Sequence, residues 1–140
     1  WDTKAAGLYM ICTLSKHEAE KQGYTDSLML DHEGYVAEAT GANIFFKDKD
    51  GTLHTPIPDS FLDGITRRTV IEIANSMNIK VNERKIKPEE LKNFVGCFLT
   101  GTAAEVTPVS QIDKFNYKVC NTIIQLSESY QQTVRKKKAA

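Results

Sequence analysis

Four short runs of strand-forming residues alternate with turn signals across residues 27 to 55, and this alternation constrains the fold most strongly. The runs are Ser27–Leu30, Tyr35–Ala39, Asn43–Lys47 and Thr52–Thr55. The turn signals between them are His32-Glu33-Gly34, Thr40-Gly41 and Lys49-Asp50-Gly51. Because β-prone runs bounded by such residues are typical of strands joined by short connections, this part of the chain is predicted to form a strand meander.

Helical patterns occur on both sides of the meander. We expect helices over Ala5–Gln22, from an N-cap at Asp63 to about Asn78, and from about Tyr117 to Val134. In the second helix, apolar residues recur at i, i+3, i+4 and i+7, as Val70, Ile73, Ala74 and Met77. This stripe should face a sheet. The basic run Arg135–Lys138 is interpreted as a solvated helix end, where the helix dipole favours positive charge.

The segment between the second and third helices contains further strands. We expect a strand over Ile79–Ile86, a short helical turn over Pro88–Asn93 and a buried strand over Val95–Thr100. Gly101–Pro108 follows as a loop of small residues that leads into an edge strand. The whole pattern predicts one α/β (α+β) domain with mixed or antiparallel strands and about three helices.

Composition narrows the function classes. The 140 residues carry 18 Lys plus Arg against 18 Asp plus Glu, so the broad positive charge of a nucleic-acid or anionic-membrane binder is absent. No apolar run approaches the roughly 20 residues that span a bilayer. Three cysteines and three histidines are scattered without the spacing of a metal site or a disulfide scaffold. We therefore expect a soluble protein with no metal, nucleic-acid or membrane partner.

Two segments contain residues that could bind an anion or another small ligand. Asp63-Gly64-Ile65-Thr66 opens a helix, where N–H groups and the dipole favour a phosphate, although a capped helix with an early glycine is the structural alternative. Thr100-Gly101-Thr102-Ala103-Ala104 ends a buried strand in small and hydroxyl residues that allow close approach to a ligand. A tight loop without any ligand explains this second segment equally well.

Two charged residues complete the set of candidates. Alternation places Glu38 on the same strand face as Val36, so a buried carboxylate there would need a partner, whereas a strand-end carboxylate commonly just reaches solvent. Lys4 precedes the small residues Ala5, Ala6 and Gly7, yet a lysine near a terminus is usually a solvated surface residue. On their own, these residues lead no further than a site for a phosphate-bearing ligand.

Taken together, the candidates resemble the fold-type IV pyridoxal-phosphate enzymes, the class IV aminotransferases, and most closely the branched-chain amino-acid aminotransferases. The resemblance runs from Lys4 to about Val109, with 34 positions from Lys4 to Glu38 (38 − 4). Its four ordered motifs are Lys4 with Gly7 and Tyr9, Glu38 with Asn43-Ile44-Phe45, Gly64-Ile65-Thr66-Arg67, and Gly101-Thr102-Ala103-Ala104-Glu105-Val106-Thr107-Pro108-Val109. It implies a mixed, largely antiparallel sheet or pseudo-barrel flanked by about three helices.

The resemblance implies pyridoxal 5'-phosphate as the cofactor and gives roles to single residues. Lys4 would bond to the cofactor aldehyde and carry the proton between substrate and cofactor, and Glu38 would keep the pyridine nitrogen protonated. Tyr9 would donate to the phenolic oxygen, and Leu62 would pack on the ring. The phosphate site would comprise Gly64, Ile65, Thr66, Gly101 and Thr102, and the substrate carboxylate would meet Thr102, Ala103 and Ala104.

The implied reaction is reversible amino transfer between leucine, isoleucine or valine and 2-oxoglutarate. Ala103 and Ala104 resemble the branched-chain enzymes more than the D-amino-acid aminotransferases, which tend to carry hydroxyl residues there. Leu8, where the family usually has Asn, and Ala42, where branched-chain enzymes often have Glu, depart from the pattern and bear on substrate choice. A D-amino-acid aminotransferase, an aminodeoxychorismate lyase of the same fold and a non-catalytic binding domain stay open as alternatives.

The resemblance also bears on domain organisation. Residues 1–140 are expected to be the C-terminal cofactor-binding domain of an enzyme roughly twice as long, without its N-terminal domain, because the sequence opens three residues before Lys4. Class IV sites lie in a cleft between two domains, so we expect this chain to be inactive alone. The family further implies a cytoplasmic homo-oligomer, a dimer or larger.

Overall fold

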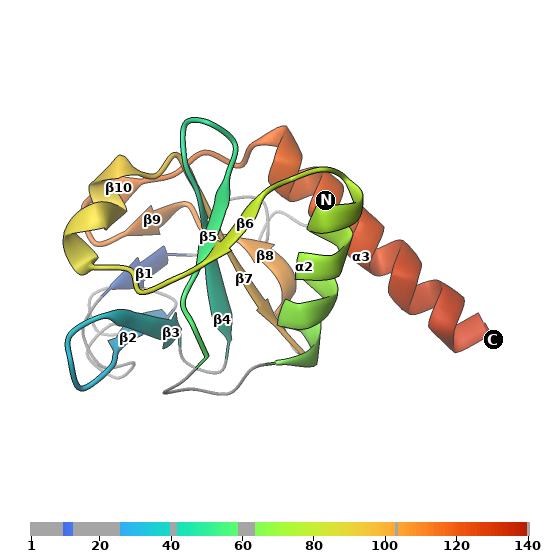
Figure 1. Cartoon of the computed structure of the whole chain (residues 1–140), viewed down its shortest axis with the longest axis horizontal. Helices are drawn as coiled ribbons and strands as arrows, with labels where there is room; N and C mark the ends of the chain where they lie inside the picture. The colour runs from blue at the N-terminus through green and yellow to red at the C-terminus, as the bar shows by residue number, and fades with distance from the viewer. Residues whose placement is uncertain (1–9, 13–25, 40–41, 59–63, 103, 140) are drawn as a thin grey trace.

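The strands of the described residues form two five-stranded sheets. The computed structural model describes residues 10–12, 26–39, 42–58, 64–102 and 104–139. In this part of the chain, two α-helices lie side by side against one of the sheets (Figure 1). Five of the eight strand pairs are antiparallel and three are parallel. This confirms the predicted mixed, largely antiparallel arrangement.

The first sheet has the order β10-β9-β1-β2-β3. Its strands are β1 (Met10–Cys12), β2 (Asp26–Leu30), β3 (Val36–Ala39), β9 (Gln111–Ile112) and β10 (Phe115–Asn116). The central strand β1 is parallel to both β2 and β9, while β2 with β3 and β9 with β10 pair antiparallel. The pairing of β9 with β10 gives a hairpin that the sequence patterns did not predict.

The position of β1 corrects one prediction. The helix expected over Ala5–Gln22 is wrong at residues 10–12, and the rest of that range lies outside the described residues. Local apolar spacing suited a helix, but β1 pairs through its backbone with strands on both sides. A short apolar run can adopt either form, and tertiary pairing decides between them.

The second sheet has the order β6-β5-β4-β7-β8 and forms the body of the molecule. Its strands are β4 (Asn43–Lys47), β5 (Leu53–Thr55), β6 (Val81–Glu83), β7 (Gly96–Gly101) and β8 (Glu105–Pro108). Strand β4 pairs with β7 over five residues, from Asn43 opposite Thr100 to Lys47 opposite Gly96. The strand expected over Ile79–Ile86 is shorter than predicted. An edge strand, β8, does follow β7, but it occupies Glu105–Pro108, so the loop predicted over Gly101–Pro108 is wrong in its second half.

Strand β4 is buried on both faces because it separates two apolar clusters. Ile44 and Phe46 belong to the cluster between the two sheets, whereas Phe45 belongs to the cluster under the helices. Phe45 stacks on Phe98 of β7 with ring centroids 4.9 Å apart, an arrangement that contributes about 0.5–1.5 kcal/mol beyond area burial. Burial on both faces explains the continuous apolar run in this strand.

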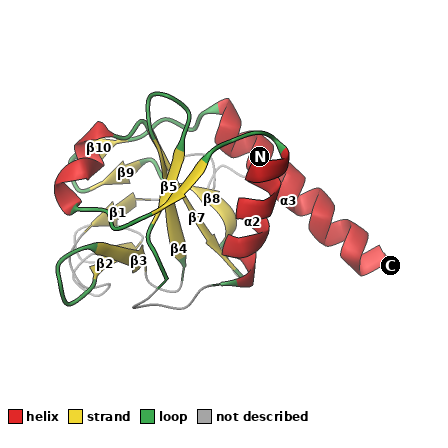
Figure 2. Cartoon of the chain, in the orientation of Figure 1, coloured by secondary structure: helices red, strands yellow, loops and turns green. Residues whose placement is uncertain are grey.

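Two long helices cover the outer face of the second sheet (Figure 2). They are α2 (Ile65–Ser76) and α3 (Asn121–Ala139), and a short 3₁₀ helix, η1 (Pro88–Asn93), lies at the expected place. Val70 and Ala74 of α2 are fully buried in the cluster with Phe45, which confirms that the predicted stripe faces a sheet. Helix α3 begins and ends a few residues later than predicted.

Three polar contacts hold the connections around this core. The buried hydroxyl of Tyr117 donates to the carbonyl of Leu91 at 2.8 Å and joins the segment before α3 to η1. At the turn between β4 and β5, the Asp48 carboxylate lies 2.7 Å from Nε2 of His54. Nε of Arg84 donates to Nδ1 of His54 at 3.1 Å, so Nδ1 is the acceptor and Nε2 carries the proton toward Asp48.

Candidate functional site

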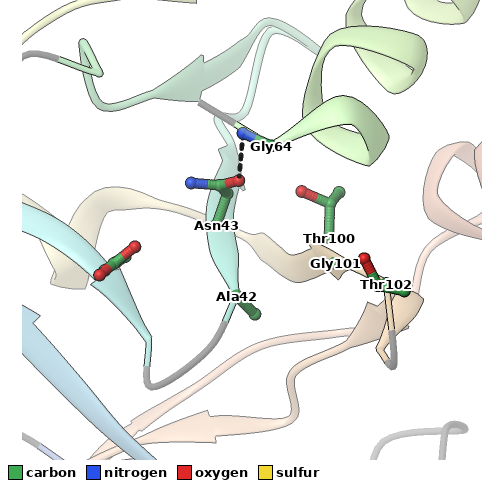
Figure 3. A pocket seen from close by; sticks show the side chains of 7 residues that line it. Ala42, Asn43, Gly64, Thr100, Gly101 and Thr102 are labelled. Carbon is green, nitrogen blue, oxygen red and sulfur yellow. Dashed lines mark hydrogen bonds between the residues drawn. The ribbon is translucent and has the colours of Figure 1, made fainter. Parts of the chain in front are cut away.

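A cavity of about 250 Å³ lies where strand ends from both sheets meet the start of α2. It is lined by Glu38, Ala42, Asn43, Gly64, Thr100, Gly101 and Thr102 (Figure 3). The volume is near the lower end of the roughly 300–1,000 Å³ typical of small-molecule pockets. These residues come from β3, from β4 and the residue before it, from the start of α2, and from the end of β7 and the residue after it, so the cavity depends on the tertiary fold.

The start of α2 forms one wall of the cavity. Gly64 is its N-cap, with an extended backbone (φ −66°, ψ 149°) and no side chain to accept from the first turn. The first N–H groups of a helix lack acceptors within the helix and lie at the positive end of its dipole. The first turn of α2 contains no acidic residue. This wall is therefore suited to an anion.

The pairing of β4 with β7 supplies the floor. Asn43 and Thr100 lie directly opposite each other in the antiparallel register, so their side chains share one face of the sheet. Thr100 is completely buried, and its hydroxyl has no hydrogen-bond partner among the residues that the structure describes. Leaving a buried hydroxyl unsatisfied costs about 1–3 kcal/mol. In Figure 3 this hydroxyl points toward the space between Asn43 and Gly64.

Glu38, on β3, also lines the cavity. Burial raises the pKa of its carboxyl above the ordinary value, because desolvation disfavours the charged form. Within the described ranges, no side chain forms a hydrogen bond or ion pair with it. A register shift between Met29 and Leu30 also interrupts the strict alternation predicted for Val36 and Glu38. A half-buried carboxylate without a partner would be stabilised by a cationic or N–H group placed in the cavity.

The structure brings some of the candidate residues together and separates others. Glu38, Gly64, Gly101 and Thr102 all line the cavity. The hydroxyl of Thr66 instead lies 3.4 Å from the hydroxyl of Tyr130 on α3, and Thr66 is not among the lining residues. Two further candidates lie elsewhere: the side chain of Ile65 is exposed, and Ala104 packs against the apolar cluster between the two sheets. The other candidates lie outside the described residues and are Lys4, Tyr9, Leu62 and Ala103.

Sequence reasoning gave no role to two residues of the cavity, Asn43 and Thr100. Oδ1 of Asn43 accepts from the backbone N–H of Gly64 at 3.3 Å, across 21 positions of sequence. Thr100 was included in the segment of small and hydroxyl residues that could approach a ligand, but without a role of its own. The sequence does show a polar residue near one end of each of two apolar strands, Asn43 in β4 and Thr100 in β7. Only the strand register shows that these two residues lie opposite each other.

Two other features, a metal site and a membrane-spanning helix, are not found among the residues that the structure describes. No group of three or more His, Cys, Asp or Glu side chains is placed there to hold a metal ion. Among the helices that the structure describes, none has both the length and the apolar character needed to cross a membrane.

Comparisons with known proteins are consistent with this geometry. The family model for amino-transferase class IV matches residues 2–112. A probable branched-chain-amino-acid aminotransferase of Rickettsia felis is 52% identical over 117 residues, which are 84% of this chain and 40% of that protein. The branched-chain-amino-acid aminotransferase of Pseudomonas aeruginosa is 43% identical over 110 residues, 79% of this chain and 36% of that protein.

Solved structures resemble the fold closely. A branched-chain aminotransferase from the thermophilic archaeon Thermoproteus uzoniensis, solved with norvaline, superposes with a TM-score of 0.80 at 39% identity, covering 84% of this chain and 40% of that one. An aminotransferase from Brucella abortus bound to the cofactor PLP gives a TM-score of 0.80 at 28% identity, covering 84% and 42%. The chain spans about half the length of the relatives it matches, or somewhat less.

Proposed function

Because this chain belongs to the class IV aminotransferases, we propose that it binds pyridoxal 5'-phosphate and serves in amino transfer between branched-chain L-amino acids and 2-oxoglutarate. The observation that carries the proposal is one cavity lined both by the start of α2, which is suited to an anion, and by the half-buried carboxylate of Glu38. The names of the relatives support leucine, isoleucine and valine as substrates. The activity is proposed for the whole protein, since the relatives are about twice as long as this chain.

The residues present fit the cofactor at its phosphate end. The start of α2 offers N–H groups, and Thr102 offers an exposed hydroxyl beside Gly101, which leaves room for close approach. The hydroxyl of Thr100, which also lines the cavity and has no hydrogen-bond partner among the described residues, supports a bound group or water in this polar pocket. A phosphate dianion satisfies both the donors and the helix dipole.

Glu38 fits the nitrogen end of the cofactor ring. Its raised pKa shows that the carboxylate is poorly stabilised in the protein alone. A protonated ring nitrogen would donate to this carboxylate and return its pKa toward the usual range. When bound, the cofactor accepts the electron pair released as the substrate loses its α-proton. Glu38 serves that chemistry by holding a proton on the ring nitrogen.

Other residues of the chain would position the reactants. Gly101, the last residue of β7, has no side chain and leaves space for a substrate carboxylate near Thr102. Lys4 stays our candidate for the covalent link to the cofactor and for the amine that moves the substrate proton. Its assignment rests on the motif spacing in the sequence, because it lies outside the described residues.

The test uses the full-length protein loaded with pyridoxal phosphate. Reduction with borohydride fixes the cofactor to its lysine, and peptide mapping should find the adduct on the peptide that contains Lys4. An adduct on Lys16 or Lys21 would contradict that assignment. A protein that shows no transfer from leucine to 2-oxoglutarate and no cofactor adduct would contradict the proposed function.

Substitution of Glu38 tests the part of the proposal that concerns the ring nitrogen of the cofactor. Glu38→Gln should lower transamination roughly 10- to 150-fold, because one charge-assisted hydrogen bond of about 1.5–3 kcal/mol is lost. Glu128→Gln, on the exposed face of α3, is the matched control and should transaminate as the parent does. Equal activity of Glu38→Gln and parent would refute the role of Glu38.

A further inference from the structure

The start of helix α2 is capped by a residue that is distant in the sequence, Asn43. The residue at its N-cap is Gly64, which has no side chain, and the cap hydrogen bond from its own side chain is therefore missing. Oδ1 of Asn43, at the start of β4, accepts from the Gly64 N–H instead. Asn43 is 6% exposed, so this contact is shielded from water. One amide thus joins the central strand of the second sheet to the helix start that forms the wall of the cavity.

The contact leaves no room for a side chain at position 64. A Cβ built on Gly64 would stand 2.8 Å from Oδ1 of Asn43, closer than real Cβ atoms approach. A side chain at position 64 would therefore displace the Asn43 amide from its hydrogen bond, although the backbone angles there suit any residue.

The charge of the capping group matters as much as its position. Aspartate and asparagine are equally good acceptors at a helix N-terminus, and aspartate additionally interacts well with the dipole. In a cavity that takes an anion, however, an aspartate would repel that anion. Asparagine supplies the hydrogen bond without a charge, so the positive end of the dipole stays available to the ligand.

We propose that Asn43 is a positioning residue for anion binding, a neutral cap that holds the start of α2 against the cavity so that its N–H groups can bind the phosphate of the cofactor. The inference rests on the proposed function and names a residue to which the family resemblance gave no role. The buried hydroxyl of Thr100, which lacks a described partner and lies opposite Asn43 in the β4–β7 register, independently indicates that a ligand completes this place.

The test compares three variants of the full chain prepared without cofactor. Asn43→Asp keeps the acceptor and adds a charge, Asn43→Ala removes the acceptor, and Asn116→Asp makes the same charge change on the exposed strand β10. Each is titrated with pyridoxal phosphate and with pyridoxal, which lacks the phosphate. Urea denaturation of the cofactor-free proteins measures the structural effect separately.

Asn43→Asp should weaken binding of pyridoxal phosphate at least about tenfold and change binding of pyridoxal less than about twofold, because the new charge acts on the phosphate alone. Its urea midpoint should lie below that of the parent, because desolvation of a carboxylate at a position only 6% exposed outweighs its favourable interaction with the dipole, so binding is compared at urea concentrations where both proteins are folded. Asn43→Ala should lower the urea midpoint and also weaken binding of pyridoxal phosphate. Asn116→Asp should match the parent in every measurement.

Several outcomes would overturn the inference, and they differ from a failure of the proposed function. Asn43→Asp that binds pyridoxal phosphate as tightly as the parent, or that loses both ligands equally, would refute the electrostatic argument. Asn43→Ala that loses stability but binds pyridoxal phosphate normally would leave Asn43 a structural residue only. A parent protein that does not bind pyridoxal phosphate would instead refute the proposed function, and this inference with it.

Discussion

The buried guanidinium of Arg67 makes the protein sensitive to a residue at its surface, Glu83. Arg67 lies in the first turn of α2 with its side chain 1% exposed, and its Nη2 donates to Oε1 of Glu83 at 2.6 Å. The same nitrogen donates to the carbonyl of Pro56 at 3.0 Å. Glu83 is on the edge strand β6, and its side chain is 48% exposed. Replacing Glu83 by alanine therefore takes the counter-ion from a charge that water cannot reach.

The expected loss of unfolding free energy follows from the difference in exposure between the side chains of Arg67 and Glu83. Two opposite charges about 4 Å apart attract by about 4 kcal/mol at an effective dielectric constant of 20. Because half of the Glu83 side chain is in solvent, screening reduces that attraction to about 1–2 kcal/mol. Leaving the buried Arg67 charge without this partner adds desolvation cost, so we expect Glu83→Ala to lose about 2–3 kcal/mol of unfolding free energy.

Urea denaturation measures this loss, with Glu128→Ala on the exposed face of α3 as the control. The control should change the unfolding free energy by less than about 0.5 kcal/mol, as is usual for a surface substitution. The double variant Arg67→Met/Glu83→Ala should lose less than the sum of the two single variants, because each single variant already breaks the same Arg67–Glu83 contact. Equal losses for Glu83→Ala and Glu128→Ala would refute the reasoning.

Three further substitutions test other contacts, each by denaturation of the cofactor-free protein. Glu38→Gln should stabilise the protein at pH 7, because a raised carboxyl pKa makes the parent lose stability as the pH rises past 4.5; a parent and variant with identical pH profiles from 4 to 7 would disprove this. Tyr117→Phe should cost about 1–2 kcal/mol, since the Leu91 carbonyl loses its donor, and a neutral result would mean that water replaces the hydroxyl. Burial tends to raise the pKa of the Asp48 carboxyl, but hydrogen bonds to it, the strongest of them from His54, lower this pKa below the ordinary value of 3.8. Asp48→Asn should therefore be less stable than the parent above pH 3.8, and the difference in stability should disappear as the pH falls.

Elements with strong local signals could be predicted from the sequence. Strand β4 lies between two turn signals and has the predicted bounds, Asn43–Lys47. The 3₁₀ helix Pro88–Asn93 also has the predicted bounds, because proline fixes its first turn. The apolar stripe of α2 is buried as expected, since a period of 3.6 residues places it on one side.

Elements set by distant contacts could not be predicted in this way. Strand β1 depends on β2 and β9 on its two sides, and its own residues suit a helix equally well. The candidate site shows the same limit. The sequence indicated Glu38, Gly64 and Thr102, but the roles that the cavity suggests for Asn43 and Thr100 depend on the register between β4 and β7. No local pattern reports a register between strands that are far apart in the chain.

The pairing of β4 with β7 also determines when the cavity can exist during synthesis of the protein. Asn43 and Thr100 are 57 positions apart (100 − 43), so a growing chain on the ribosome makes the first half of the cavity long before the second. Until β7 emerges, β4 presents the unpaired edge of Ile44, Phe45 and Phe46, a segment suited to association with other chains. We expect the nascent protein to need protection by a chaperone over this interval, and to gain its affinity for phosphate only after residue 102 has left the exit tunnel.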